Sequence, residues 1–202
     1  MSEASKKQPV FSNDHDKVVS FDSEQLILVD PSDQEVGFAS KGRCHDEAGI
    51  LHRAFSVFVF NSNSELLLQQ RSATKRLWPL YWANTCCSHP RRGETMEQAT
   101  QRRMEQEVGF SCEVDYLYKF EYHATFGDLG AEHELCWVYA GVCDPIVKPN
   151  RQEIAACRWV SVAQIERELL DSPEQFTPWF KLEWAQLRKR YPLVRDAKRD
   201  QF

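Results

Sequence analysis

The chain has 202 residues, a formal net charge of −5 and an expected isoelectric point near 5.7. This length suits one compact domain that can enclose a dry pocket. Its 25 lysines and arginines are scattered, so no basic face is expected to bind a nucleic acid. No run of about 18 apolar residues is available to cross a membrane, and the polar N-terminal stretch is unlike a signal or transit peptide.

Seven cysteines occur at irregular spacings. An odd number without a regular framework is typical of a reducing compartment rather than of a disulfide scaffold. We therefore expect a cytoplasmic protein. Because neither a nucleic acid nor a membrane is an expected partner, the predicted partner is a small molecule, and we expect a monomer.

Both ends of the chain are predicted to be flexible tails. Residues 1–22 are polar and lack periodicity, and residues 192–202 are charged and follow a Tyr-Pro stop. The folded part is then a single domain over residues 23–191.

Strand patterns begin at residues 25–29, an apolar run that ends at a turn cluster over residues 30–33. A hairpin is predicted from residues 54–60 to residues 66–70, because residues 61–64 (NSNS) tolerate turn geometry. Further strands are predicted over residues 114–122, 134–142 and 156–160.

The clearest helix is predicted over residues 96–108, where Thr95 and Gln98 have the spacing of a capping box and Gly109 is a natural stop. A second helix is expected after Ser161. A third is expected after Thr177, with Pro178 in its first turn. Strands interleaved with few helices predict an α/β fold in which a mixed β-sheet is flanked by α-helices.

A motif starts at Ser88 and ends at Phe110. It resembles the Nudix box, G-x5-E-x7-R-E-U-x-E-E-x-G-U, in which U is a bulky apolar residue. Six positions match the box: Glu94, Arg102, Met104, Glu107, Gly109 and Phe110. Three positions depart from it, because Ser88 replaces the first glycine while Arg103 and Gln106 replace two acids.

The departures bear on chemistry, because Nudix hydrolases use these carboxylates to bind divalent metals on a pyrophosphate and to activate water. Losing two of them should cripple hydrolysis. Glu107 remains as a hard oxygen ligand suited to a Mg²⁺ ion that also holds a substrate diphosphate. The structural alternative is an Arg103–Glu107 ion pair at i,i+4 on the helix.

Five further segments are similar to the type 1 isopentenyl diphosphate isomerases, and they lie in order over most of the predicted folded part. They are residues 51–56 (LHRAFS), 71–79 (RSATKRLWP), 82–90 (WANTCCSHP), 132–136 (EHELC) and 177–179 (TPW). This resemblance implies a Nudix-like domain. The implied activity is the reversible 1,3-allylic isomerisation of isopentenyl diphosphate to dimethylallyl diphosphate in isoprenoid biosynthesis.

Three of the six histidines, His45, His52 and His89, fall in or near the matching segments. Glu132 and Glu134 are spaced i,i+2, so on a strand both carboxylates point to the same face and can reach one ion. Three imidazoles and two carboxylates suit Mn²⁺, Zn²⁺ or Fe²⁺. The expected ions are thus Mg²⁺ with the diphosphate and a second divalent ion, Mn²⁺ or Zn²⁺, at the histidines.

Isomerisation requires that the alkene gain a proton at one carbon and lose one two carbons away, through a tertiary cation. The resemblance implies that Cys87 and Glu134 are the two proton-transfer groups, with Tyr122 assisting Glu134. It also assigns catalysis to Cys87, two residues before His89, and leaves Cys86 as a packing residue. Which of the two groups protonates is left open.

An aromatic face can stabilise the cation without trapping it. Trp179 is the candidate, followed by Trp82. The resemblance also implies that basic residues hold the diphosphate, namely Lys41, Arg71, Lys75 and Arg103. At Arg103 a clamp would then replace a water-activating acid.

Two other functions stay open. A Nudix-type diphosphate hydrolase would act on a nucleoside or prenyl diphosphate, against which the lost acids argue. A non-catalytic module would bind a diphosphate or metal, but it would not need a Cys, Glu and Tyr set. No flavin or nicotinamide is expected, since the chain has eight glycines and no G-x-G-x-x-G.

Overall fold

The computed structural model describes residues 16–191. The strands are β1 (Gln25–Val29), β2 (Glu35–Ser40), β3 (His52–Phe60), β4 (Glu65–Arg71), β5 (Trp82–Ala83), β6 (Cys86–Ser88), β7 (Asp115–Thr125), β8 (Ala131–Val142) and β9 (Ile154–Ser161). The helices are α1 (Lys41–His45), α2 (Met96–Val108), α3 (Val162–Asp171) and α4 (Pro178–Arg190), with a 3-10 turn at Pro173–Gln175.

Strand β3 is the centre of the sheet. Along one edge it runs parallel to β8 over its whole length. Along the other edge it meets β1, β6 and β4 in turn, all antiparallel. β7 is antiparallel to β8, and β9 is antiparallel to β4. The sheet is therefore mixed, as predicted.

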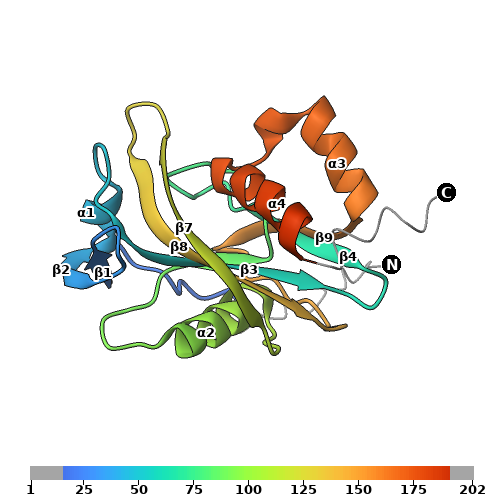
Figure 1. The fold of residues 1–202 in the computed structure, drawn as a ribbon, viewed down its shortest axis with the longest axis horizontal. Helices are drawn as coiled ribbons and strands as arrows, with labels where there is room; N and C mark the ends of the chain where they lie inside the picture. The colour runs from blue at the N-terminus through green and yellow to red at the C-terminus, as the bar shows by residue number, and fades with distance from the viewer. Residues whose placement is uncertain (1–15, 192–202) are drawn as a thin grey trace, which may run out of the picture.

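Helices cover both faces of this sheet (Figure 1), with α2 on one side and α3 and α4 on the other. Alternate residues of a strand point to opposite faces, so Val57 and Val59 pack with Met104 of α2. Phe58 and Phe60 point the other way and pack with Phe180 and other residues of α4. Each fully buried side chain of this size contributes roughly 1.5–3 kcal/mol, so both layers hold the sheet.

Helix α2 has the predicted bounds, 96–108. The Thr95 side chain accepts from the Gln98 backbone, and the Gln98 side chain accepts from the Thr95 backbone. Gly109 ends the helix in the left-handed region, with φ at 78°, and a Cβ there would lie 2.7 Å from Lys148. Only glycine fits that position. Among residues 16–191, no helix is both long and apolar enough to span a bilayer.

The other predicted elements are also present: β1, the β3–β4 hairpin, β7, β8, β9, α3 and α4. In the hairpin turn, the Asn61 side-chain oxygen accepts from the backbones of Asn63 and Glu65. Four elements were not predicted: β2, α1, β5 and β6. Each is six residues or shorter, which is too short to show a clear period, and β2 contains a glycine.

Residues 16–22, which the sequence assigned to the N-terminal tail, lie against the domain. The Lys17 carbonyl accepts from Asn150 at 2.8 Å, and the Val19 carbonyl accepts from Arg103 at 3.1 Å. This segment is attached through polar side chains and backbone carbonyls. The hydrophobic pattern of the sequence therefore could not predict that it packs on the domain. The rest of the predicted tails, residues 1–15 and 192–202, lies outside the described residues.

Candidate active site

A cavity of about 310 Å³ lies beside the N-terminal end of β3. It is lined by all the predicted site residues except His52, Trp82 and Glu107: Lys41, His45, Arg71, Lys75, Cys87, His89, Arg103, Tyr122, Glu132, Glu134 and Trp179. Val18, Ser20 and Asp22 of the N-terminal segment line it as well. Residues far apart in the sequence thus share one cavity.

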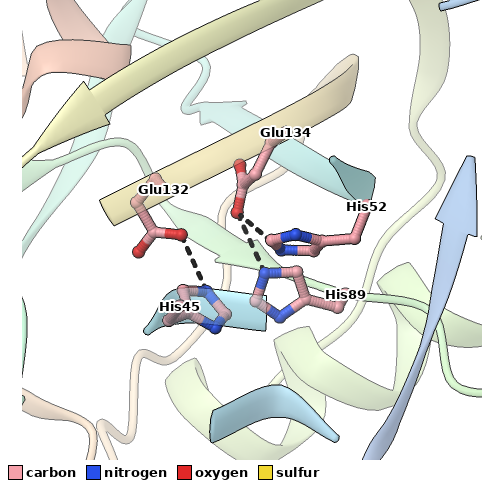
Figure 2. Close-up of side chains that lie close together, drawn as sticks. All are labelled: His45, His52, His89, Glu132 and Glu134. Atoms are coloured by element: carbon pink, nitrogen blue, oxygen red, sulfur yellow. Dashed lines mark hydrogen bonds and ion pairs between the residues drawn. The ribbon is translucent and has the colours of Figure 1, made fainter. Parts of the chain in front are cut away.

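The three histidines and two glutamates form a buried cluster on one side of this cavity. One ligand atom from each of the five lies within 4.8 Å of all the others. Figure 2 shows both carboxylates descending from one strand toward the imidazoles. His45 Nε2 lies 2.8 Å from Glu132 Oε2, and His89 Nε2 lies 2.9 Å from Glu134 Oε1.

The sheet accounts for this convergence. Glu132 and Glu134 are two residues apart on β8, so their side chains lie on the same face. Glu134 pairs with His52 across the parallel β3–β8 ladder. His45 comes from α1, which packs beside β8. The close approach of the β7–β8 turn to α1 requires Gly130, because a Cβ there would lie 2.2 Å from the His45 carbonyl oxygen.

Two of the imidazole rings are held in place by backbone carbonyls at Nδ1, the ring nitrogen that points away from the cluster. His45 Nδ1 and His52 Nδ1 each lie 2.7 Å from a backbone carbonyl, of Lys41 and Ile50 respectively. If Nδ1 donates to the carbonyl, the Nε2 lone pair points into the cluster, which is the usual orientation of a ligating histidine. Within the described residues, buried His52 Nε2 has no hydrogen-bond partner. This orphaned nitrogen and the N/O donor set fit a divalent metal ion.

The charges in the cluster also call for a cation. Burial, followed by the neighbouring His45, lowers the pKa of His52 to about 3. Burial, followed by the charge of Glu132, raises the pKa of Glu134 well above its ordinary value. Burial acts against the charged form of Glu132, but His45 outweighs it and lowers the pKa of Glu132 to about 2. A bound cation would relieve the repulsion between the two carboxylates.

The neighbouring cysteines on β6 point to opposite faces of the sheet. Cys86 is fully buried beneath α2 with Met104 and Val108. Cys87 faces the cavity, and its thiol donates to Asn84 Oδ1 at 2.7 Å. Burial raises the pKa of the Cys87 thiol well above its ordinary value. The geometry thus separates the two cysteines in the way that the resemblance implied.

Across the cavity, Tyr122 Oη donates to Glu134 Oε2 at 2.6 Å. The two residues are direct neighbours in the antiparallel β7–β8 ladder. Burial, followed by the Glu134 carboxylate, raises the pKa of Tyr122 well above its ordinary value, so the phenol keeps its proton. Glu134 therefore has one oxygen facing His89 and one bound to a phenol.

The four predicted cations also line the cavity. Lys41 contacts the Ser20 hydroxyl, and Lys75 forms an ion pair with Glu153. The Arg71 guanidinium donates to the carbonyls of Leu77 and Trp78 and lies 5.2 Å from the Trp179 ring centroid. Burial, followed by the nearby Lys75 charge, lowers the pKa of Lys41, as expected where cations crowd.

Glu107 does not line the cavity. It forms the i,i+4 ion pair with Arg103, which was the structural alternative, and accepts from Gln69 at 3.3 Å. Arg103 also contacts Glu153 at 3.2 Å. Glu153, a buried acid among three cations, was not singled out in the sequence. Glu153 lies just before β9 and belongs to no motif, so only its position could have indicated it.

The aromatic candidates separate as well. Trp179 begins α4, is 3 % exposed and lies 6.3 Å from Tyr122, centroid to centroid. Trp82 is not among the cavity-lining residues, and Arg158 stacks on it at 4.2 Å. The second aromatic candidate is therefore wrong. His123 and His133 lie outside the cluster and contact the Ala48 carbonyl and Glu121.

Residues 50–180 match the family model of the NUDIX domain. Curated relatives are similar over most of the chain. An isopentenyl-diphosphate Delta-isomerase 1 from Photorhabdus laumondii is 40% identical over 170 residues, which cover 83% of this chain and 97% of that protein. An isopentenyl-diphosphate Delta-isomerase from Burkholderia multivorans is 44% identical, covering 78% of this chain and 89% of that protein.

Solved structures share the fold at low identity. The crystal structure of DR0079 from Deinococcus radiodurans has a TM-score of 0.58 at 18% identity, covering 89% of this chain and 100% of that one. A MutT NUDIX hydrolase from Burkholderia pseudomallei has a TM-score of 0.52 at 16% identity, covering 65% and 94%. Fold and sequence agree: the chain belongs to the isopentenyl-diphosphate Delta-isomerase family, type 1, within the Nudix superfamily.

Proposed function

We propose that this cavity interconverts isopentenyl diphosphate and dimethylallyl diphosphate by adding a proton at one carbon and removing one at another. One observation carries the proposal. A thiol, Cys87, and a tyrosine-linked carboxyl, Glu134, line the same cavity as four cationic side chains. This is the set of groups that an allylic proton shift on a diphosphate requires.

The proton balance uses two groups. One adds a proton to the terminal methylene carbon of isopentenyl diphosphate, which leaves a tertiary cation, and the other takes a proton from the carbon next to the one that bears the diphosphate oxygen. Cys87 and Glu134 are the two groups, and they exchange roles in the reverse direction. Tyr122 holds one Glu134 oxygen and supplies a proton donor to that carboxyl. Burial raises the pKa of both groups, which favours the protonated form that the donor needs, while the acceptor must first have lost its proton.

The transient cation needs stabilisation without a nucleophile. Trp179 offers an aromatic face at the cavity wall. A buried site also excludes water, which would otherwise trap the cation as an alcohol.

The substrate diphosphate binds to Lys41, Arg71, Lys75 and Arg103. Arginine suits this task through its fork of donors, and lysine acts as a point charge. Glu107 is the ligand for a Mg²⁺ ion that accompanies the diphosphate. For this, the carboxylate must loosen its contact with Arg103, which the phosphate oxygens would then replace as the partner of the guanidinium.

A second divalent ion, Mn²⁺ or Zn²⁺, would be held by His45, His52, His89, Glu132 and Glu134. When bound, it supplies a fixed positive charge that lowers the cost of ionising Glu134. The residues themselves orient that carboxyl: the pleat of β8 aims it into the cavity, and Tyr122 fixes its rotation.

The hydrolase alternative is weakened by the box itself. Arg103 binds Glu107 where a hydrolase would present acids, and Gln106 accepts from Arg102 and Arg103 at 3.3 Å. Without those carboxylates, no cluster of box acids faces the cavity to activate water.

The experiment is to incubate the purified chain with isopentenyl diphosphate and Mg²⁺, and to follow the allylic product by NMR. A parallel assay measures phosphate and pyrophosphate release from prenyl and nucleoside diphosphates. We expect allylic product without phosphate release. Phosphate release without isomerisation would favour the hydrolase, and neither activity would favour a binding module.

We also propose that the folded residues act as one domain and as a cytoplasmic monomer. Seven free thiols, some of them half-buried, suit a reducing compartment. Light scattering coupled to size exclusion would measure the mass against 23.6 kDa.

A further inference from the structure

Helix α4 buries a carboxyl group that the reaction described above does not use. Glu183 is 0% exposed. It lies one helical turn after Trp179, so both side chains are on the face of α4 that packs on the sheet. A buried ionised carboxylate without a cation costs several kcal/mol, so a sequence that retains an acid here is expected to keep it protonated.

The partners of this carboxyl lead toward the cavity. Glu183 Oε1 lies 3.4 Å from Cys136 Sγ, and Cys136 Sγ lies 3.5 Å from Ser56 Oγ. Ser56 Oγ in turn lies 3.6 Å from Cys87 Sγ. These distances are ordinary for hydrogen bonds to sulfur. Among the described residues, the other carboxyl oxygen, Glu183 Oε2, has no hydrogen-bond partner.

The sheet fixes this arrangement. Ser56 and Cys87 are paired residues of β3 and β6, and Cys136 lies on β8, the other neighbour of β3. The Tyr118 hydroxyl donates to the Glu183 backbone carbonyl at 3.0 Å and anchors this turn of α4 over the strands. Ser56 is therefore held between the Glu183 carboxyl and the Cys87 thiol.

The Cys136 thiol has one proton and two possible acceptors, Glu183 Oε1 and Ser56 Oγ. If Glu183 is ionised, its carboxylate accepts this proton, and Cys136 Sγ then competes with Cys87 Sγ for the Ser56 proton. If Glu183 is protonated, the acid donates to Cys136 Sγ, the Cys136 proton points at Ser56 Oγ, and the serine proton is free to point at Cys87 Sγ. The Cys87 thiol proton already has its own acceptor, Asn84 Oδ1, at 2.7 Å.

We propose that Glu183 is a positioning residue: through Cys136, its protonated carboxyl directs the Ser56 hydroxyl toward Cys87 Sγ, so that the hydroxyl donates to the sulfur whenever Cys87 has given up its proton. The inference rests on the proposed isomerase function. In either direction of the reaction Cys87 is a buried thiolate for part of the cycle. A hydrogen bond to a charged group is worth roughly 1.5–3 kcal/mol, so losing this one slows turnover by about 10- to 100-fold.

The protonation state agrees with this role. Burial raises the pKa of Glu183 to about 8, and hydrogen bonding at its carboxyl lowers it only in part. The titratable groups around Glu183 are Cys87 on β6, Tyr118 on β7, and Glu134 and Cys136 on β8. Among the described residues, no lysine or arginine is among the groups that shift its pKa.

The test compares four variants by their kcat, KM and pH profile in the isomerase assay. Ser56→Ala and Glu183→Leu each remove one member of the arrangement, and the double variant removes both. Glu183→Gln keeps a neutral donor in the same shape. Tyr118→Phe is the matched control, because it removes a buried hydrogen bond to the same residue without touching the carboxyl.

We expect Ser56→Ala and Glu183→Leu each to lower kcat by about 10- to 100-fold, with KM within about twofold of wild type. The double variant should be no slower than the slower single variant, because both remove the same hydrogen bond. Glu183→Gln should keep kcat near wild type and move the alkaline decline of kcat to higher pH, because an amide cannot ionise. Tyr118→Phe should keep both kcat and the pH profile.

Several outcomes overturn the inference alone, provided that the wild-type chain isomerises its substrate. They are a wild-type kcat in Glu183→Leu or Ser56→Ala, multiplied losses in the double variant, or an unmoved alkaline decline in Glu183→Gln. If Glu183→Leu fails to fold, the serine and glutamine variants still decide. A wild-type chain that produces no dimethylallyl diphosphate overturns the proposed function, and this inference with it.

Discussion

Tyr122 and Glu134 face one another across the β7–β8 ladder, with 2.6 Å between the phenol oxygen and the carboxyl oxygen. Removing the hydroxyl in Tyr122→Phe leaves Glu134 without its donor. We expect kcat to fall by about 10- to 100-fold, the loss that follows when a hydrogen bond to a charged group is removed. KM should change little, since Tyr122 lies away from the cations. Steady-state kinetics measure both, and half-exposed Tyr116→Phe on the same strand is the control.

Cys87→Ala should abolish isomerisation while leaving the fold and diphosphate binding intact, because it removes one proton-transfer group without touching the cations. Cys86→Ala should keep turnover, with a modest loss of stability from its buried site beneath α2. Turnover and calorimetric binding of a diphosphate analogue measure the two effects. An inactive Cys86 variant beside an active Cys87 variant would reverse the assignment.

Replacing His45, His52 or His89 with alanine should lower metal content and activity together, because each imidazole is one arm of the same cluster. Metal analysis of the purified variants and their turnover provide the readout. Chelation of the wild-type chain should lower its melting temperature, since the ion binds only the folded arrangement. A variant that loses activity yet retains full metal content would remove that histidine from the ligand set.

Restoring the box acids in an Arg103→Glu/Gln106→Glu variant should weaken the isomerase. A carboxylate at position 103 would repel the diphosphate and leave Glu107 and Glu153 without their guanidinium partner. We expect the KM for isopentenyl diphosphate to rise by a factor on the order of 10 to 100, equivalent to ~1.4 to 2.8 kcal/mol. The restored acids could also permit slow phosphate release. A double variant with wild-type KM and kcat would show that Arg103 does not touch the diphosphate.

Glu183 should make stability depend on pH. Its pKa is about 8 in the folded protein against about 4.3 for an ordinary glutamate. Between these pH values the unfolded chain releases a proton that the folded chain retains, so the free energy of unfolding falls as pH rises. Glu183→Gln lacks this dependence. Its melting temperature relative to wild type should therefore increase from pH 5 to pH 8, and a constant difference would mean that the carboxyl titrates normally.

The sequence predicted the fold class and most long elements, because each carries its own signal: runs of apolar and aromatic residues for β3 and β8, and a capping box with a glycine stop for α2. It missed elements such as β6, whose few residues cannot establish a period. The pairing of β6 with β3 depends on contacts between segments about 30 residues apart.

Site residues were predicted where motifs carried them, as for Cys87 and Glu134. Glu153 and Glu183 were missed because their roles depend on contacts with residues that are distant in the sequence. A signal for Glu183 existed: positions 179, 180, 183, 184 and 187 form one buried face of α4, and an acid in such an apolar stripe is unusual. Nothing local linked it to Ser56, more than 120 residues earlier.

One strand, β8, carries Glu132, Glu134 and Cys136 at alternate positions on a single face. The pleat sets these side chains about 6.7 Å apart in steps of two residues, so the strand geometry fixes their spacing. Sliding β8 by one residue against β3 would turn all three away from the cavity at once. Selection cannot adjust their spacing one residue at a time. Changes in specificity should instead arise in parts of the site outside β8, such as residues 16–22 and the first turn of α4.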